Sequence, residues 1–194
     1  MPPRQDDWSG PRPLATRAPY AVIALLAVVL AVAIVLAVRR DVDVPGQVAA
    51  HYVDMMAGTL RAELESADAA SLERALAQKG AGFTPRIRSL EPDFTLAGGG
   101  LVQIEGRPAA FWYYRDRRSD VILAAAFTGS LAEVGQTTDV RNEAAPPLHV
   151  YRKATQTVVF WRDGAQVYTA SSTLPGERAV AMARRLASGT KPAR

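Results

Sequence analysis

The hydrophobic pattern divides the chain into one long apolar run and a mixed C-terminal part. Residues 21–38 read AVIALLAVVLAVAIVLAV and contain only Ala, Val, Ile and Leu. With Tyr20 at the boundary, a helix rising about 1.5 Å per residue nearly matches a hydrocarbon core of roughly 30 Å. We therefore predict a transmembrane helix over residues 20–38.

Two other interpretations of this run fit the pattern less well. A buried core helix would normally show a polar face or breaks, and this run shows neither. A cleaved signal peptide has the small-x-small form Ala31-Val32-Ala33 and the basic leader in its favour. Its apolar region, however, normally spans about 7 to 15 residues, and here the candidate cleavage site lies inside a longer run. We therefore favour an uncleaved anchor.

The excess positive charge of the chain lies beside the apolar run. The formal net charge is +4, yet residues 41–194 carry 18 Lys and Arg against 17 Asp and Glu. The excess comes from five flanking arginines: Arg4, Arg12, Arg17, Arg39 and Arg40. Arginines beside a hydrophobic span set topology and meet lipid headgroups, so this charge indicates a lipid bilayer and no nucleic acid as partner.

Helical periodicity follows the apolar run. Pro45 suits the first turn of a helix with Asp41 and Asp43 near its positive end. Apolar side chains then recur every three or four residues at Val48, Tyr52, Met55, Met56, Leu60 and Leu64. Residues 66–68 offer N-caps for a second, shorter helix that Gly80 would terminate.

Strand-like periodicity begins at Phe83. Residues 101–105, 109–115 and 120–127 form short β-branched and aromatic runs that predict an antiparallel meander. Residues 129–147 are polar and predict a surface loop.

A second hairpin and a closing helix complete the pattern. Residues 156–162 and 165–171 flank Asp163-Gly164, a strong hairpin signal. Pro175 then opens a helix with a narrow apolar stripe, which ends near Gly189.

These elements predict an α+β fold. It consists of one N-terminal transmembrane helix, two helices, an antiparallel sheet of about five to six strands, and a C-terminal helix, with the helices at both ends covering one face of the sheet. The expected organisation is a disordered cytoplasmic tail (1–19), the span (20–38), an extracytoplasmic domain (41–188) and a flexible tail (189–194).

Residues that could carry chemistry are few. The chain has no cysteine, and His51 and His149 lack metal-ligand spacing, since no HxxxH, HExxH or CxxC motif occurs. No serine lies in a G-x-S-x-G elbow, and the glycines at 98–100 lack the Lys and Ser or Thr of a phosphate-binding loop, which favours a simple turn into the next strand. We therefore expect no catalytic residue, metal or cofactor, and predict a binding module rather than an enzyme.

One cluster combines basic and aromatic residues. Arg115, Arg117 and Arg118 follow Trp112, Tyr113 and Tyr114, a mixture that can stack single-stranded nucleic acid. Strand aromatics that alternate into a core, followed by arginines on a solvated turn, explain the same pattern more simply.

The order of several short motifs resembles the extracytoplasmic domain of bacterial transmembrane anti-sigma factors, also described as transmembrane transcriptional regulators. In chain order, these motifs are residues 51–57, Gly82-Phe83-Thr84-Pro85 followed by Leu90, residues 94–101, residues 106–110, residues 114–116, residues 158–164 and residues 168–174. The resemblance covers roughly residues 20–188. It implies a cytoplasmic N-terminus and a periplasmic or otherwise extracytoplasmic C-terminal domain at the cell inner membrane.

The chain departs from that family before the span. Many members carry a cytoplasmic helical domain there, often with a His and Cys zinc motif, which binds the sigma factor. Only about 19 residues precede the apolar run here, so direct sequestration of a sigma factor is in doubt. The resemblance therefore implies a membrane regulatory protein whose outer domain is a sensor or partner-binding module. The protein partner that it implies is a sigma chain, an anti-sigma chain or another membrane protein.

The alternative is a non-catalytic accessory or assembly subunit of another membrane complex. In either case the predicted span offers small residues for close helix packing, at Ala24, Ala27, Ala31 and Ala37.

Overall fold

The computed structural model describes residues 25–29, 43–137 and 139–189, and the chain divides into two compact units after Arg40. In the first unit, residues 25–29 are helical and exposed. No helix among the described residues is long and apolar enough to cross a membrane. The described fold thus contains no transmembrane helix, which corrects the prediction for residues 20–38. The remainder of that range, like residues 1–19 and 190–194, lies outside the described residues.

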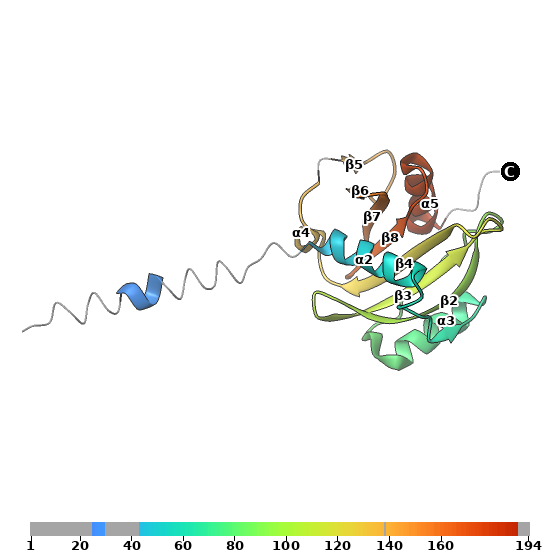
Figure 1. The fold of residues 1–194 in the computed structure, drawn as a ribbon, viewed down its shortest axis with the longest axis horizontal. Helices are drawn as coiled ribbons and strands as arrows, with labels where there is room; N and C mark the ends of the chain where they lie inside the picture. The colour runs from blue at the N-terminus through green and yellow to red at the C-terminus, as the bar shows by residue number, and fades with distance from the viewer. Residues whose placement is uncertain (1–24, 30–42, 138, 190–194) are drawn as a thin grey trace, which may run out of the picture. The chain divides into compact units, whose positions relative to one another are not determined.

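The second unit is built on one antiparallel sheet of eight strands in the order β1-β2-β3-β4-β8-β7-β6-β5 (Figure 1). Its strands are β1 (Leu64–Glu65), β2 (Thr95–Ile104), β3 (Arg107–Arg115), β4 (Val121–Thr128), β5 (Asp139–Arg141), β6 (Leu148–Lys153), β7 (Gln156–Asp163) and β8 (Gln166–Ser172). The predicted number of five to six strands is wrong. The edge strands β1 and β5 have two and three residues, too few for alternation to be visible in the sequence.

The three helices predicted after residue 40 begin where local signals placed them. The helices of the second unit are α2 (Val44–Met56), α3 (Ala69–Leu76), α4 (Leu131–Val134) and α5 (Gly176–Ser188), with a π-helical turn η1 (Ala77–Ala81) after α3. The first predicted helical stripe runs too far, because α2 ends at Met56 and Leu64 belongs to β1. The predicted loop over residues 129–147 contains α4 and β5. The hairpin around Asp163-Gly164 and the end of α5 at Gly189 are confirmed.

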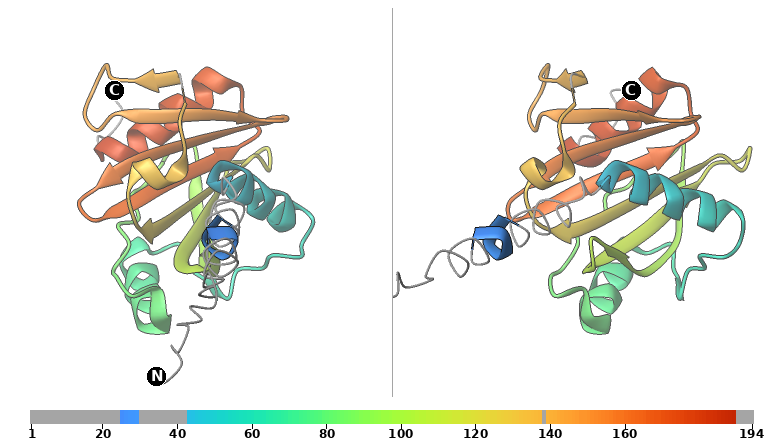
Figure 2. Two further views of the ribbon diagram at one scale, coloured as in Figure 1. Left: turned by 90° about the vertical axis from the view of Figure 1, so that its left-hand side faces the viewer. Right: turned by 60° about the vertical axis from the view of Figure 1, so that its left-hand side comes forward.

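The two long helices cover opposite faces of the sheet (Figure 2). On one face, α2 and α4 pack over an apolar cluster that includes Phe111, Leu123 and Phe160. On the other face, α3 and α5 pack over a cluster that includes Trp112 and Trp161. The prediction that helices from both ends share one face is therefore wrong. Consecutive strand residues point to opposite faces, so an apolar run such as residues 109–112 supplies both cores.

The three glycines at 98–100 lie inside β2 rather than in the turn we predicted. A Cβ atom on Gly99 would lie 2.3 Å from the carbonyl oxygen of Phe111, and one on Gly98 would lie 2.4 Å from that of Leu64. Gly100 has the ring of Phe111 against it, where a Cβ would be 2.8 Å from a ring carbon. These glycines therefore permit close approach of β1 and β3 to β2.

Helix α2 is fixed at its start by local and long-range contacts. The Oδ1 atom of Asp43 accepts a hydrogen bond of 3.0 Å from the amide of Gly46, which makes Asp43 the N-cap. The Oδ2 atom of Asp43 accepts one of 2.8 Å from Nζ of Lys153, the last residue of β6. The helix start is thereby joined to the β6–β7 hairpin.

Candidate functional site

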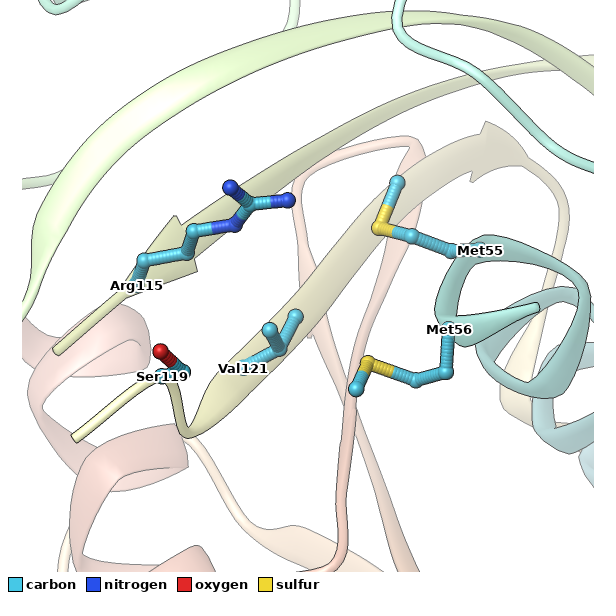
Figure 3. A pocket seen from close by; sticks show the side chains of 5 residues that line it. All are labelled: Met55, Met56, Arg115, Ser119 and Val121. Carbon is cyan, nitrogen blue, oxygen red and sulfur yellow. The ribbon is translucent and has the colours of Figure 1, made fainter. Parts of the chain in front are cut away.

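The end of α2 and the tip of the β3–β4 hairpin enclose a hollow of about 250 Å³. Its lining residues are Met55, Met56, Arg115, Ser119 and Val121, and we refer to them as the Met–Arg hollow. Figure 3 shows the methionine side chains reaching out from α2 and the arginine side chain reaching in from the end of β3. The hollow thus combines two flexible thioethers, one guanidinium, one hydroxyl and one branched aliphatic side chain.

Exposed apolar surface concentrates beside this hollow. Among the described residues from 43 to 189, two large hydrophobic residues are more than half exposed. They are Val53 and Met56, with exposed fractions of 53% and 54%. The two residues are three positions apart on α2 and therefore neighbours on one side of the helix. Met55 is only half-buried, so the last turn of α2 leaves apolar atoms of all three side chains accessible.

The last turn of α2 holds the methionines in place. Gly58 has a φ of 77° and donates its amide to the carbonyl of Met55 at 3.0 Å, which closes the helix. The hydroxyl and the amide of Thr59 both donate to the carbonyl of Asp54 at 2.9 Å. The methionine backbone is consequently fixed while their long side chains keep their rotational freedom.

A carboxylate organises the opposite wall. The Oδ1 atom of Asp116 accepts hydrogen bonds from the amides of Arg118 and Asp120, both at 2.8 Å. Ser119, between them, has a φ of 67°, and its amide donates to the carbonyl of Asp116 at 3.2 Å. This turn orders the hairpin tip and commits the Oδ1 atom of Asp116 to backbone amides.

One positively charged side chain, that of Arg115, lines the hollow. Arg115 lies over the ring of Tyr113, with its guanidinium carbon 5.2 Å from the ring centroid. Among the residues that the structure describes, none of Arg115, Arg117 and Arg118 forms an ion pair with a carboxylate. The next acidic residue along the chain is Asp120, and its Oδ2 atom lies 3.9 Å from Nη1 of Arg178 rather than beside one of these three arginines.

A second, larger hollow of about 590 Å³ lies at the other end of α2 and has a different character. Its charged residues compensate one another or a neighbour. Lys153 hydrogen-bonds Asp43 and lowers the pKa of that carboxyl, and Arg107 hydrogen-bonds Glu133 and lowers its pKa in the same way. The hydroxyl of Tyr151 donates to the carbonyl of Gly135 at 2.6 Å. The carboxylates of Asp43 and Glu133 in this hollow are thus already hydrogen-bonded to cationic side chains.

The histidines considered from the sequence lie on different elements. His51 donates from Nε2 to the carbonyl of Gln103 at 3.0 Å, and His149 lies half-buried in β6. Over the described residues, no three His, Asp or Glu side chains come together as a metal site would require. The structure therefore gives neither histidine a ligand set.

The aromatic residues next to the arginines divide between the two faces of β3. Trp112 and Tyr114 are 1% and 0% exposed, and their side chains are joined by a 2.9 Å hydrogen bond from Nε1 to the tyrosine hydroxyl. Tyr113 lies half-buried on the opposite face. Buried rings of this kind offer no stacking platform for bases.

Of the four alanines predicted to pack against another membrane helix, one belongs to the described residues. Ala27 is helical and exposed. Ala24, Ala31 and Ala37 lie outside the described residues, so their shared face stays a prediction.

Sequence reasoning found both walls of the Met–Arg hollow but did not join them. Met55 and Met56 were assigned to the apolar stripe of a helix, and the arginines to a solvated turn. Adjacent residues on a helix point about 100° apart, so two consecutive methionines already indicated that one of them faces solvent. Nothing local indicated that the β3–β4 turn lies opposite.

No family model matches this chain, and comparison with curated proteins and with solved structures likewise gives no match.

Proposed function

We propose that this protein is a non-catalytic regulatory protein of the cell envelope whose folded domain binds a partner protein through the Met–Arg hollow. The observation that carries the proposal is the coincidence of exposed Val53 and Met56 with arginines that lack a carboxylate partner in the described structure. Exposed apolar side chains beside polar groups mark interaction surfaces, and Met and Arg are enriched in protein interfaces.

The class of partner follows from the order of sequence motifs. Those motifs resemble transmembrane anti-sigma factors, which supports an anti-sigma chain or another membrane protein as the partner at the hollow. The arginines around the apolar residues 21–38 support a location at the inner membrane, with residues 43–189 outside the cytoplasm. Regulation then requires that partner binding outside changes a complex inside.

Site-specific photo-crosslinking in intact cells tests this function. A photoreactive amino acid replaces Met56 in the full-length chain, and a control chain carries it at Thr155, which is exposed in the β6–β7 turn. We expect a defined protein adduct from the Met56 position that the Thr155 position does not give. Equal adduct patterns from both positions would refute binding at the hollow.

A transcription measurement separates regulation from an accessory role. Deletion of residues 43–189 should change the expression of a set of genes if the protein regulates transcription. Unchanged transcription, together with a Met56 adduct to a subunit of a stable enzyme or transport complex, would replace regulation by the accessory role.

A further inference from the structure

The Met–Arg hollow also carries information about the chemistry of its occupant. Resting on the proposed function, we infer that it receives an acidic segment of the partner protein. One apolar side chain of that segment inserts between Met55 and Met56, while neighbouring carboxylates face Arg115, Arg117 and Arg118.

The size of the hollow fits a single side chain. Its volume of about 250 Å³ falls below the roughly 300–1,000 Å³ that is typical of small-molecule sites. Its walls are the thioethers of Met55 and Met56 on one side and Val121, which is 5% exposed, on the other. Unbranched methionines adapt to the shape of an inserted apolar group, which suits them to bind a leucine-sized or phenylalanine-sized side chain.

The arginines at the β3–β4 turn favour acidic residues on either side of the inserted side chain in the partner segment. Arg115 lines the hollow, and Arg117 and Arg118 follow it in the β3–β4 turn. In the same turn, the Oδ1 atom of Asp116 accepts hydrogen bonds from two backbone amides rather than from an arginine. Guanidinium groups bind carboxylates in a two-pronged geometry that favours acidic over basic segments. The ring of Tyr113 holds Arg115 beside the hollow, so less side-chain freedom is lost when it binds a carboxylate.

The charge-paired hollow at the other end of α2 provides the contrast. It is larger, yet Asp43 and Glu133 are already hydrogen-bonded to Lys153 and Arg107. A charged segment placed there would have to displace these contacts. The Met–Arg hollow differs in that its lining arginine, Arg115, forms no ion pair with a carboxylate of the described residues.

An anionic lipid surface would attract the same arginines. Interfacial binding, however, needs a broad apolar face that protrudes into the headgroup region. Here the apolar groups line a concave surface, and the exposed large ones in residues 43–189 of the described structure are Val53 and Met56 alone. These observations favour a protein segment.

Charge reversal within the crosslinking experiment tests the inference. The photoreactive residue stays at position 56, and the full-length chain additionally carries Arg115→Glu and Arg118→Glu. Like charges facing each other across an interface disfavour binding strongly, so we expect the adduct yield to fall by at least about tenfold. Arg115→Lys with Arg118→Lys keeps the charge but loses the two-pronged geometry, so its yield should lie between those of the parent and the charge-reversed chain. Arg162→Glu, at an exposed position on β7, should leave the yield unchanged. Circular dichroism of the purified variants establishes that they are folded.

Each outcome bears on a distinct statement. An adduct that maps by mass spectrometry to a segment with several carboxylates, and that charge reversal abolishes, supports the inference. An adduct that persists after charge reversal, or maps to a neutral or basic segment, overturns the inference and leaves the proposed function standing. A lipid adduct in place of a protein adduct assigns the hollow to the membrane surface and overturns both. The absence of any Met56-specific adduct also refutes both.

Discussion

The imidazole of His51 donates from Nε2 to the main-chain carbonyl of Gln103, at 3.0 Å, and so joins α2 to the outer edge of the sheet. One helical turn earlier, the side-chain oxygen of Gln47 accepts from the amide of Glu105 at 2.9 Å. Strand β1 pairs only with Gly98 and Gly99, which leaves the rest of β2 as an edge. His51 therefore occupies a carbonyl of β2 that a strand of another molecule would otherwise use, and Gln47 holds the helix against the turn that follows β2.

Removal of both side chains should expose this edge. We expect the double variant Gln47→Ala, His51→Ala to form dimers or larger species at concentrations where the parent chain does not, because free strand edges template pairing. Size-exclusion chromatography with light scattering, under identical conditions for both chains, measures the change. Ala50→Ser, at an exposed position on the same helix, is the control. Unchanged mass for the double variant would show that the helix backbone suffices to cover the edge.

The hydroxyl of Tyr114 links the core under α5 to the segment before β2. It accepts from Nε1 of Trp112 at 2.9 Å and donates to the carbonyl of Arg88 at 2.6 Å. Burial raises the pKa of Tyr114 well above its usual range, so the group stays protonated and able to donate.

Tyr114→Phe should therefore leave Nε1 of Trp112 without its acceptor and the carbonyl of Arg88 without its donor. The free energy of unfolding is expected to fall by about 1–3 kcal/mol, since unsatisfied buried polar groups carry that cost. Urea unfolding followed by tryptophan fluorescence gives the value. Tyr113→Phe, at the half-buried neighbour on the opposite face, should change it by much less. Equal losses at the two positions would contradict the assigned role.

The contacts around the glycines of β2 predict which alanine substitution costs more stability. Gly99→Ala places a Cβ 2.3 Å from the backbone oxygen of Phe111, whereas Gly100→Ala places one 2.8 Å from the ring of that residue. A ring can rotate away, but a paired backbone cannot without breaking the ladder. We expect Gly99→Ala to cost more than about 2 kcal/mol and Gly100→Ala less. Chemical denaturation of the two variants tests the order, and the reverse order would refute this explanation.

The contact between Asp43 and Lys153 should make the free energy of unfolding depend on pH. The hydrogen bond from Lys153 lowers the pKa of Asp43 below its ordinary value of 3.8. A lowered pKa in the folded state stabilises the fold above the unfolded pKa, and the contribution disappears as pH falls through the folded pKa. Both side chains are more than one third exposed, so solvent screening limits the contribution to under about 1 kcal/mol.

Lys153→Met should thus destabilise the fold slightly at about pH 6 and by less at about pH 2.5, where Asp43 is more protonated. Urea unfolding at both pH values gives the comparison. In an Asp43→Asn background, which keeps a capping side chain, Lys153→Met should have little effect at either pH. An undiminished effect in that background would mean that Lys153 acts through packing rather than through Asp43.

Local chemistry along the chain was sufficient to place several elements. Asp43 and Pro45 start α2, and Asp68 starts α3 by accepting from the amide of Ser71 at 3.0 Å. Asp163-Gly164 joins β7 to β8, and Gly189 ends α5 with a φ of 64°. These features depend on residues within a few positions of one another, which is why their sequence signals are reliable.

The tertiary structure alone decided the relations between distant segments. Strands of two or three residues, β1 and β5, have no pattern of their own and form only because β2 and β6 offer an edge. The glycines at 98–100 have the same composition as a turn, but the approach of Phe111 requires them in a strand. The sequence by itself determined where α2 begins and that Met55 and Met56 follow one another. That these methionines face Arg115 across a hollow depends on the helix crossing the sheet, a contact between residues far apart along the chain.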